Sequence, residues 1–485
     1  MNRSQPRRWG RPPSQDRGGA GPLPMTPRAL ARGADALFLA ALAALPLAGI
    51  GVVTLLTGRD PGAGFQPSYL LMAAAVVLAA AAAGPRRLLS GWAVAGGWPW
   101  LVAIGALALS AVGLVTAPSL ASPPEAWLRY AKQVVQWGVT AVFALHTAWW
   151  LRGDERRWRA AVGALAAGLV LQLLYAAWQA WGFYRPGAAF AWTEAVATSN
   201  ATILSGSEEL YLGRGFVGIP RLRGTICEPL YLGNYLLAVL PWIWAVGRPG
   251  RARAALVGGG LALLLLTWSR GAWLSAVLSA AVALIAGARA GVLPPRRRWW
   301  RPALAAAVLI VVAVAATGGD GPRLVLQRLR QTFSTEDWSN LTRWYSMQAA
   351  WRCFLAAPWT GVGWGQYGFH FPLLVDPMGL QSQFAWPVAN NVVLKILGET
   401  GAPGLIAFGA GVLATMRRTW RALRASAATR VDERLRVVAA VVAVAGVWSQ
   451  LLTFSQDNLP HIWVVLGMLL AATDIARAEP GEGTS

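Results

Sequence analysis

Several arginines stand at the edges of apolar runs, where they could bind a phosphorylated ligand. Arg221 and Arg223 precede one such run, Arg270 lies in the short break between two others, and Arg343 lies in a long polar stretch. A guanidinium group donates two parallel hydrogen bonds to a phosphate and stays charged at any relevant pH. The alternative role of each arginine is contact with lipid headgroups or with the loop acids Glu194, Glu208, Glu209 and Glu336. Arg270 is the strongest candidate, because a charge between closely spaced apolar helices is costly unless it is used.

The other chemically capable residues form no recognisable soluble-enzyme motif. The sequence contains no Walker loop, dinucleotide-binding glycines or zinc signature, so neither a metal nor another cofactor is predicted. Cys227 and Cys353 cannot form a metal or haem site. They either pair in a disulfide outside the membrane or stay as unpaired small hydrophobic residues. His146 and His461 are expected to pack or hydrogen-bond at helix ends, whereas His370 lies in the long polar stretch.

The composition indicates that these residues belong to a membrane protein. Hydrophobic residues make up 55% of the chain and charged residues 13%, with a mean hydropathy of +0.44. Soluble domains average about 25% charged residues. The net charge of +22 does not indicate nucleic-acid binding, because the arginines fall in short clusters between apolar runs and no nucleic-acid-binding motif is present. We therefore expect membrane lipids, and no nucleic acid, as partners.

The apolar runs predict an all-α integral membrane protein with about twelve transmembrane helices, each needing about 20 apolar residues. The runs lie at 34–57, 68–84, 94–117, 133–151, 160–182, 229–247, 254–268, 272–291, 302–318, 392–416, 437–454 and 460–476. Together they define a transmembrane domain over residues 34–477. Residues 1–33 predict a disordered basic cytoplasmic tail, and residues 478–485 a short cytoplasmic tail at the other terminus.

Arginines also predict the orientation of the helices, because they occupy every second connection. The basic segments are the N-terminal tail, 86–87, 152–159, 248–253, 289–301, 417–436 and Arg477. The positive-inside rule places these segments and both termini in the cytoplasm. The long connections 183–228 and 319–391 then lie outside. The second, between the ninth and tenth predicted helices, contains a surface helix that Asn340 can cap and Pro358 stops.

Four stretches of the chain carry short motifs in a fixed order. They are Arg223-Gly224-Thr225-Ile226-Cys227-Glu228-Pro229; Thr267-Trp268-Ser269-Arg270-Gly271; Arg343 with Pro358 and Gly361-Val362-Gly363-Trp364-Gly365; and Asn391, Leu394, Glu399 and Gly401. Their order, and their position in a twelve-helix topology with a large loop before the tenth helix, resemble the O-antigen ligase/polymerase family. That family consists of bacterial inner-membrane proteins, so the large loop corresponds to the family's periplasmic loop.

The resemblance implies a glycosyltransferase that works on the periplasmic face of the inner membrane without a metal. Its donor would be a glycan on a polyprenyl diphosphate, and its acceptor the hydroxyl of a glycan, lipid or protein in O-antigen or exopolysaccharide assembly. The arginines would hold the diphosphate, and two asparagines would orient the acceptor sugar. The residues expected to act in catalysis are Arg270, Arg343, His370 and Asn390, and those expected to bind the substrates are Arg221, Arg223, Glu228, Asn391 and Glu399.

One position departs from the family pattern. Asn390 stands where the family has a histidine that is thought to activate the acceptor hydroxyl, and an asparagine amide cannot accept that proton. Another base can serve, from among His370, Asp376 and Glu399. Alternatively, a good leaving group reduces the need for a base, or the protein does something else on the same scaffold. Glu399 is also spaced for a local ion pair with Lys395.

A transporter, or a non-catalytic relative on the same scaffold, is the alternative function. Twelve helices is a common number for carriers, which usually show inverted repeats and ionisable residues near the midplane. The predicted helices carry almost no carboxylates, and the large outer loop has no counterpart in the first half of the chain. Within the resembling family, a ligase and a polymerase differ only in the acceptor, and both remain open.

Overall fold

The computed structural model describes residues 26–50, 56–57, 66–96, 98–117, 119, 121–197, 221–226, 228–293, 321–335, 337–374, 387–425 and 430–474. Within these ranges the secondary structure is helical, which confirms the predicted all-α class. The helices are α1 (Pro27–Ala43), α3 (Pro67–Ala83), α4 (Pro85–Gly96), α5 (Trp98–Ser110), α6 (Gly113–Thr116), α7 (Pro123–Leu151), α8 (Glu155–Tyr184), α9 (Ala188–Ala197), α12 (Pro229–Val246), α13 (Arg251–Leu266), α14 (Arg270–Arg289), α16 (Gly321–Arg330), the 3₁₀ helix η2 (Gln331–Phe333), α17 (Trp338–Ala356), α18 (Tyr367–Leu374), α19 (Val392–Ala425), α20 (Val431–Gln450) and α21 (Pro460–Asp474).

Four of the described helices are long and apolar enough to cross a membrane, namely α8, α12, α14 and α19. Helix α3 and the start of α4 make a fifth if this pair, bent by 113°, is one span. The predicted number of about twelve helices is therefore not confirmed. Helices α13 and α21 have only 16 and 15 residues, α20 begins with charged residues, and the run at 302–318 lies outside the described residues.

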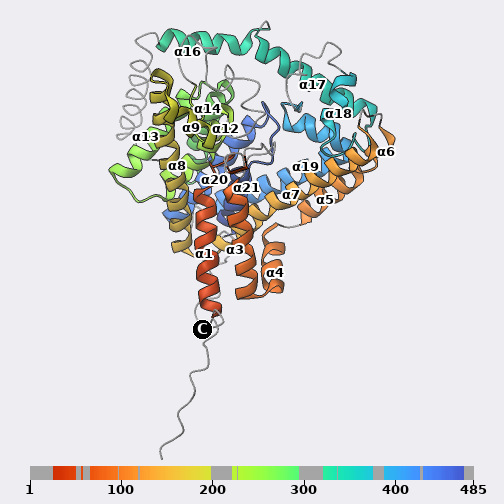
Figure 1. Ribbon diagram of the computed structural model, residues 1–485. Helices are drawn as coiled ribbons and strands as arrows, with labels where there is room; N and C mark the ends of the chain where they lie inside the picture. The colour runs from red at the N-terminus through yellow and green to blue at the C-terminus, as the bar shows by residue number, and fades with distance from the viewer. Residues whose placement is uncertain are drawn as a thin grey trace, which may run out of the picture.

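The bundle has two ends with different polar contacts. At one end, Asp474 at the end of α21 pairs with Arg152 and with Arg418, and Arg436 of α20 pairs with Glu155 at the start of α8. These arginines come from basic segments that alternate along the chain, so folding brings those segments together. Helices α16 and α17 lie at the opposite end, at the top of Figure 1, whereas α1 and α4 extend at the bottom.

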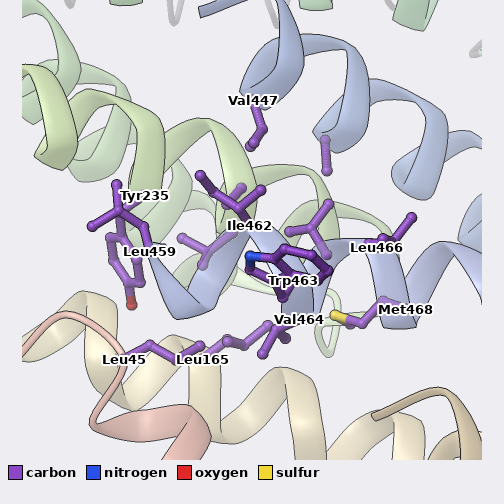
Figure 2. Close-up of a cluster of buried hydrophobic side chains, with 14 of the residues drawn as sticks. Leu45, Leu165, Tyr235, Val447, Leu459, Ile462, Trp463, Val464, Leu466 and Met468 are labelled. Carbon is purple, nitrogen blue, oxygen red and sulfur yellow. The ribbon is translucent and has the colours of Figure 1, made fainter. Parts of the chain in front are cut away.

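Helix α21 forms the centre of the apolar core. Its side chains are almost all buried, and Ile462 and Trp463 pack among residues of other helices, including Tyr235 of α12 and Leu165 of α8 (Figure 2). A Cβ atom on Gly467 would lie 2.3 Å from a backbone oxygen of α7. Small residues let helices approach closely in membranes, where packing drives association. Helix α20 in turn contacts both α12 and α14. The core therefore fixes the position of α12, which follows Arg221 in the chain, and of α14, which begins at Arg270.

Helix α17 is the surface helix predicted in the long polar stretch, but its cap differs. The N-cap is Asp337, whose carboxylate accepts a hydrogen bond from the Asn340 backbone N–H at 3.1 Å. The Asn340 side chain does not cap the helix. It donates to the carbonyl oxygens of Gln331 and Ser334, at 2.9 and 2.8 Å, and so fastens the preceding turn to α17. The helix ends at Ala356, just before Pro358, as predicted.

The glycine-rich turn after α17 binds the backbone of α19. Val362 N–H donates to the Gly398 carbonyl and Gly363 N–H to the Glu399 carbonyl, both at 3.0 Å. Gly361 has a φ of 66°, a left-handed conformation that side chains disfavour. The turn therefore sets the position of α17 relative to Glu399.

We expect Gly361→Ala to destabilise the protein by about 2–4 kcal/mol, because backbone strain is joined by a steric clash. Its Cβ atom would lie 2.2 Å from the carbonyl carbon of Glu399. The thermal unfolding midpoint of the purified protein measures this effect. Gly138→Ala in α7 is the control, since its Cβ meets open space and should leave stability unchanged or slightly raised. Equal midpoints for the two variants would contradict the expectation.

Candidate functional site

Four arginines converge at the end of the bundle that carries α16 and α17. They are Arg221, Arg270, Arg328 and Arg343, and we call them the arginine cluster. Burial, together with the positive charges of the other three, lowers the pKa of Arg328 to about 10. Burial and neighbouring arginines also lower the pKa of Arg221 and of Arg343. The four side chains therefore act on one another electrostatically, although they come from three helices and the segment before α12.

Arg270 is held most tightly among them. It is the first residue of α14 and is 6% exposed. Its Nη1 donates to the Gln331 carbonyl at 2.6 Å, and its Nη2 donates to Asp337 Oδ1 at 3.0 Å and to Asn340 Oδ1 at 3.1 Å. The break predicted between two apolar runs at Ser269-Arg270-Gly271 is confirmed, since α13 ends at Leu266. Its arginine connects α14 to the loop helices.

Arg328 was not among the residues singled out from the sequence. It lies on α16, where its Nε donates to the Trp268 carbonyl at 3.4 Å and its Nη1 to Gln331 Oε1 at 3.0 Å. The sequence around it alternates leucine and arginine, and Arg330 two positions later is exposed. Only the folded position of α16 distinguishes the two arginines.

Two carboxylates face the arginine cluster. Asp337 pairs with Arg270, and Glu228 at the N-cap of α12 interacts with Arg221 and Arg343. Burial raises the pKa of Glu228, which these two arginines oppose. The cluster thus gathers four cations beside Asp337 and Glu228. Guanidinium groups donate paired hydrogen bonds to phosphate oxygens, so the chemistry of the cluster suits an anionic ligand such as a diphosphate.

Arg223 lies apart from the arginine cluster, although it was predicted to hold the same ligand. It is buried in an ion pair with Glu194 of α9, one of the loop acids considered as its partner. Tyr175 Oη and Gln179 Nε2 donate to the same carboxylate at 2.6 and 3.0 Å. The structure gives Arg223 a place in a buried polar network that joins α8 and α9 to the segment before α12.

Asn390 lies close to Arg343 along α17. Its Nδ2 donates to Ser346 Oγ at 3.1 Å, and Ser346 is one helical turn after Arg343. Asn390 has a φ of 48°, a left-handed conformation that asparagine and histidine tolerate better than most residues. The structure therefore brings Asn390 and the arginine cluster to the same face of α17.

Asn391 and Glu399 have contacts within the protein. Asn391 accepts from the Leu394 backbone N–H at 3.0 Å at the start of α19 and donates to a carbonyl of the 451–455 turn. Glu399 is 2% exposed and accepts from the Tyr367 backbone N–H at 3.1 Å. Lys395 forms its close ion pair with Asp457, at 2.6 Å, because the turn before α21 folds over the start of α19. Its predicted partner Glu399 attracts it electrostatically without such a contact.

His370 and Cys353 lie on the loop helices. His370 in α18 is 2% exposed, and burial lowers its pKa to about 4, so it is neutral and only weakly basic near pH 7. Cys353 is a free buried thiol whose pKa burial raises to about 12.

Cys227 and Asp376 lie outside the described residues. Within the described ranges, no three His, Cys, Asp or Glu side chains are grouped as metal ligands.

Burial of His370 predicts a pH-dependent stability. The folded chain binds this proton less readily than the unfolded chain, whose histidine titrates at 6.5. The resulting contribution to the free energy of unfolding is complete above pH 6.5 and is lost as the pH falls toward 4. We expect the thermal midpoint of His370→Gln to fall less between pH 6.5 and pH 4 than that of the natural protein. This difference in slope is expected even if the substitution changes the midpoint at pH 8. Parallel curves for the two proteins would show that His370 is not responsible.

Residues 254–409 match the family model described as O-antigen ligase. The matched region begins in α13 and ends in α19, and it contains Arg270, Arg328, Arg343 and Asn390. No curated protein matches the chain significantly. The apolar helices agree with a membrane protein. The part of the chain that carries Arg270, Arg328 and Arg343 is therefore similar to O-antigen ligases.

Proposed function

We propose that the protein is a glycosyltransferase that moves a glycan from a polyprenyl diphosphate to an acceptor hydroxyl in cell-surface polysaccharide assembly. The family match supports membrane glycan processing of the O-antigen ligase/polymerase kind. The observation that carries the finer proposal is the arginine cluster. Its four guanidinium groups lie within and beside the matched domain, and they can donate paired hydrogen bonds to a diphosphate leaving group.

The reaction is a single displacement. The acceptor oxygen attacks the anomeric carbon, the bond from that carbon to the diphosphate oxygen breaks, and the acceptor proton leaves to solvent or a base. Negative charge develops on the departing diphosphate, and preorganised donors aimed at such charge usually contribute more to catalysis than any other single effect. Arg270, Arg328 and Arg343 would supply these donors with Arg221, without a metal. Inversion at the anomeric carbon follows.

Little general-base assistance is needed in this scheme. Asn390 has no basic nitrogen, and His370 has a pKa of about 4. The proton would leave late, after the bond to the diphosphate has largely broken. Asn390 would instead hydrogen-bond an acceptor hydroxyl beside Arg343. Of the three interpretations left open by the sequence, we therefore favour the one that relies on the leaving group.

The orientation follows from the two ends of the bundle. The end that gathers Arg152, Arg418 and Arg436 would face the cytoplasm by the positive-inside rule. The arginine cluster lies at the opposite end, with α16 and α17. That end would face the periplasm of a bacterial inner membrane, where a lipid-linked glycan is presented from the outer leaflet. Both chain termini would be cytoplasmic.

The rival proposal, a transporter, predicts a different phenotype. A transferase lacking Arg270 and Arg343 should leave lipid-linked glycan units to accumulate while surface polymer is lost. A strain without the gene that keeps its normal surface glycan would refute the transferase. Reconstitution with a lipid-linked oligosaccharide then separates the two branches by gel, since a polymerase makes a ladder and a ligase transfers one block.

Arg328→Ala should lower transfer from a lipid-linked oligosaccharide by about 100-fold, as expected for losing one donor to a developing anion. Arg330→Ala is the matched control, because Arg330 lies exposed on the same helix, and it should retain near-normal transfer. Both are measured in proteoliposomes at equal amounts of folded protein, as judged by thermal midpoint. Equal rates for the two variants would remove Arg328 from the site.

Asn390→His tests the role of the base. The left-handed backbone at this position accepts histidine. If a missing base limited the rate, the variant would gain something approaching the usual contribution of about 10²–10⁴. We expect no such gain, and a rate within about threefold of the natural protein, because the leaving group carries the reaction. A large gain would restore the interpretation that a base is missing.

A further inference from the structure

A second polar site lies between α7, α19 and the turn before α21. It is a cavity of about 120 Å³, which we call the α7–α19 cavity. Its polar side chains include Arg129, Gln133 and Gln136 from α7, Lys395 and Glu399 from α19, and Asp457 from the turn. At ~30 Å³ per molecule, the space corresponds to about four waters. The cavity can therefore take one face of a sugar ring, with hydroxyl groups turned toward the polar lining.

The charges of this cavity differ from those of the arginine cluster. Arg129 and Lys395 are matched by Glu399 and Asp457, so the described lining is neutral in sum, and Lys395 is already paired with Asp457 at 2.6 Å. Gln133 Nε2 donates to Gln136 Oε1 at 3.2 Å, which leaves further amide groups for a ligand. Amides and carboxylates together can match hydroxyl groups, which both donate and accept. A neutral polyol therefore suits the cavity, and a diphosphate does not.

Glu399 provides an independent sign of a ligand. One carboxylate oxygen, Oε1, accepts from the Tyr367 N–H. The other, Oε2, is buried and has no hydrogen-bond partner within the described part of the chain. A buried carboxylate oxygen without a partner is costly. Because Glu399 lines the cavity, a small rotation of its carboxylate would bring this oxygen to a hydroxyl group bound there.

The cavity adjoins the arginine cluster through one short segment. Residues 387–389 line the cavity, and the next residue, Asn390, turns through its left-handed backbone to reach Ser346 beside Arg343. The wall of one site thus leads directly to the other. In a single displacement, acceptor and leaving group must approach the anomeric carbon from opposite sides, and two adjoining sites of different charge meet that need.

We infer that the α7–α19 cavity binds a neutral sugar unit of the acceptor, through Gln133, Gln136 and Glu399. The arginine cluster takes the diphosphate of the donor. The assignment to the acceptor rests on the proposed function, whereas sugar binding at the cavity does not. Gln133 and Gln136 then help to set acceptor specificity.

The test uses the full-length protein in nanodiscs with two probes. Methyl glycosides of glucose, galactose and N-acetylglucosamine probe the cavity by saturation-transfer NMR, and inorganic pyrophosphate probes the arginine cluster by calorimetry. Gln136→Trp fills the cavity, and Gln136→Ala removes one amide with less risk to folding. Lys132→Ala is the matched control, since Lys132 is exposed on the same helix and does not line the cavity.

We expect the natural protein and Lys132→Ala to bind at least one methyl glycoside. Gln136→Ala should weaken that binding about tenfold, as the loss of buried hydrogen bonds predicts, and Gln136→Trp should abolish it. Both variants should keep their affinity for pyrophosphate. Arg328→Ala should show the reverse pattern. In transfer assays, Gln136→Ala should raise the KM for the acceptor and leave the KM for the donor unchanged.

The inference is overturned if no glycoside binds the natural protein, or if the Gln136 variants bind it normally. Displacement of the glycoside by pyrophosphate would also overturn it, because the sugar would then occupy the donor site. Absence of any transfer by the natural protein has a different meaning. That result refutes the proposed function, and the binding pattern still decides whether the cavity is a sugar site.

Discussion

The three hydrogen bonds of Arg270 are the contact on which the end of the molecule with α16 and α17 depends. They reach the Gln331 carbonyl, Asp337 and Asn340, and so tie the first residue of α14 to η2 and to the start of α17. Asn340 in turn holds the preceding turn. A charge buried at this junction is tolerated because Asp337 pairs with it. Loss of Arg270 would therefore release the loop helices as well as remove a cation, so measurements on Arg328 report on the charge more cleanly.

The distribution of arginines explains how one residue type can serve two purposes. At the end near Asp474, arginines from segments far apart in the chain pair with acids and close the bundle. At the other end, four arginines lie close enough to act on one another electrostatically. Arg223 is two residues from Arg221 in the chain, but Glu194 pairs with it within a buried network, as Asp474 does with its arginines. The distinction is between arginines that connect helices and arginines that gather their charge at one place, and it depends on contacts between distant residues.

The sequence predicted the helical class, the break at Arg270 and a surface helix ending before Pro358, since each depends on local patterns of residue type. It did not predict contacts between residues far apart in the chain. Arg328 could not be separated from Arg330, because two neighbours on an amphipathic helix differ only in what lies opposite them. Lys395 was expected to pair with Glu399 by helical spacing, yet a turn sixty residues later supplied Asp457. The predicted number of spans is not confirmed, because only four described helices, or five with the bent pair, combine the length and the hydropathy that a span needs.

The two polar sites differ in charge, and this difference links them. The arginine cluster gathers four cations, whereas at the α7–α19 cavity Oε2 of Glu399 has no hydrogen-bond donor among the described residues. A reaction that brings a diphosphate to the first site and a hydroxyl-rich ring to the second would use both. Asn390 lies between the two sites, and its amide can hydrogen-bond groups on either side without adding a charge to the arginine cluster. A histidine with a normal pKa would add a partial positive charge beside four arginines, which repulsion would oppose. An asparagine at this position is therefore compatible with a site that relies on arginines for the leaving group.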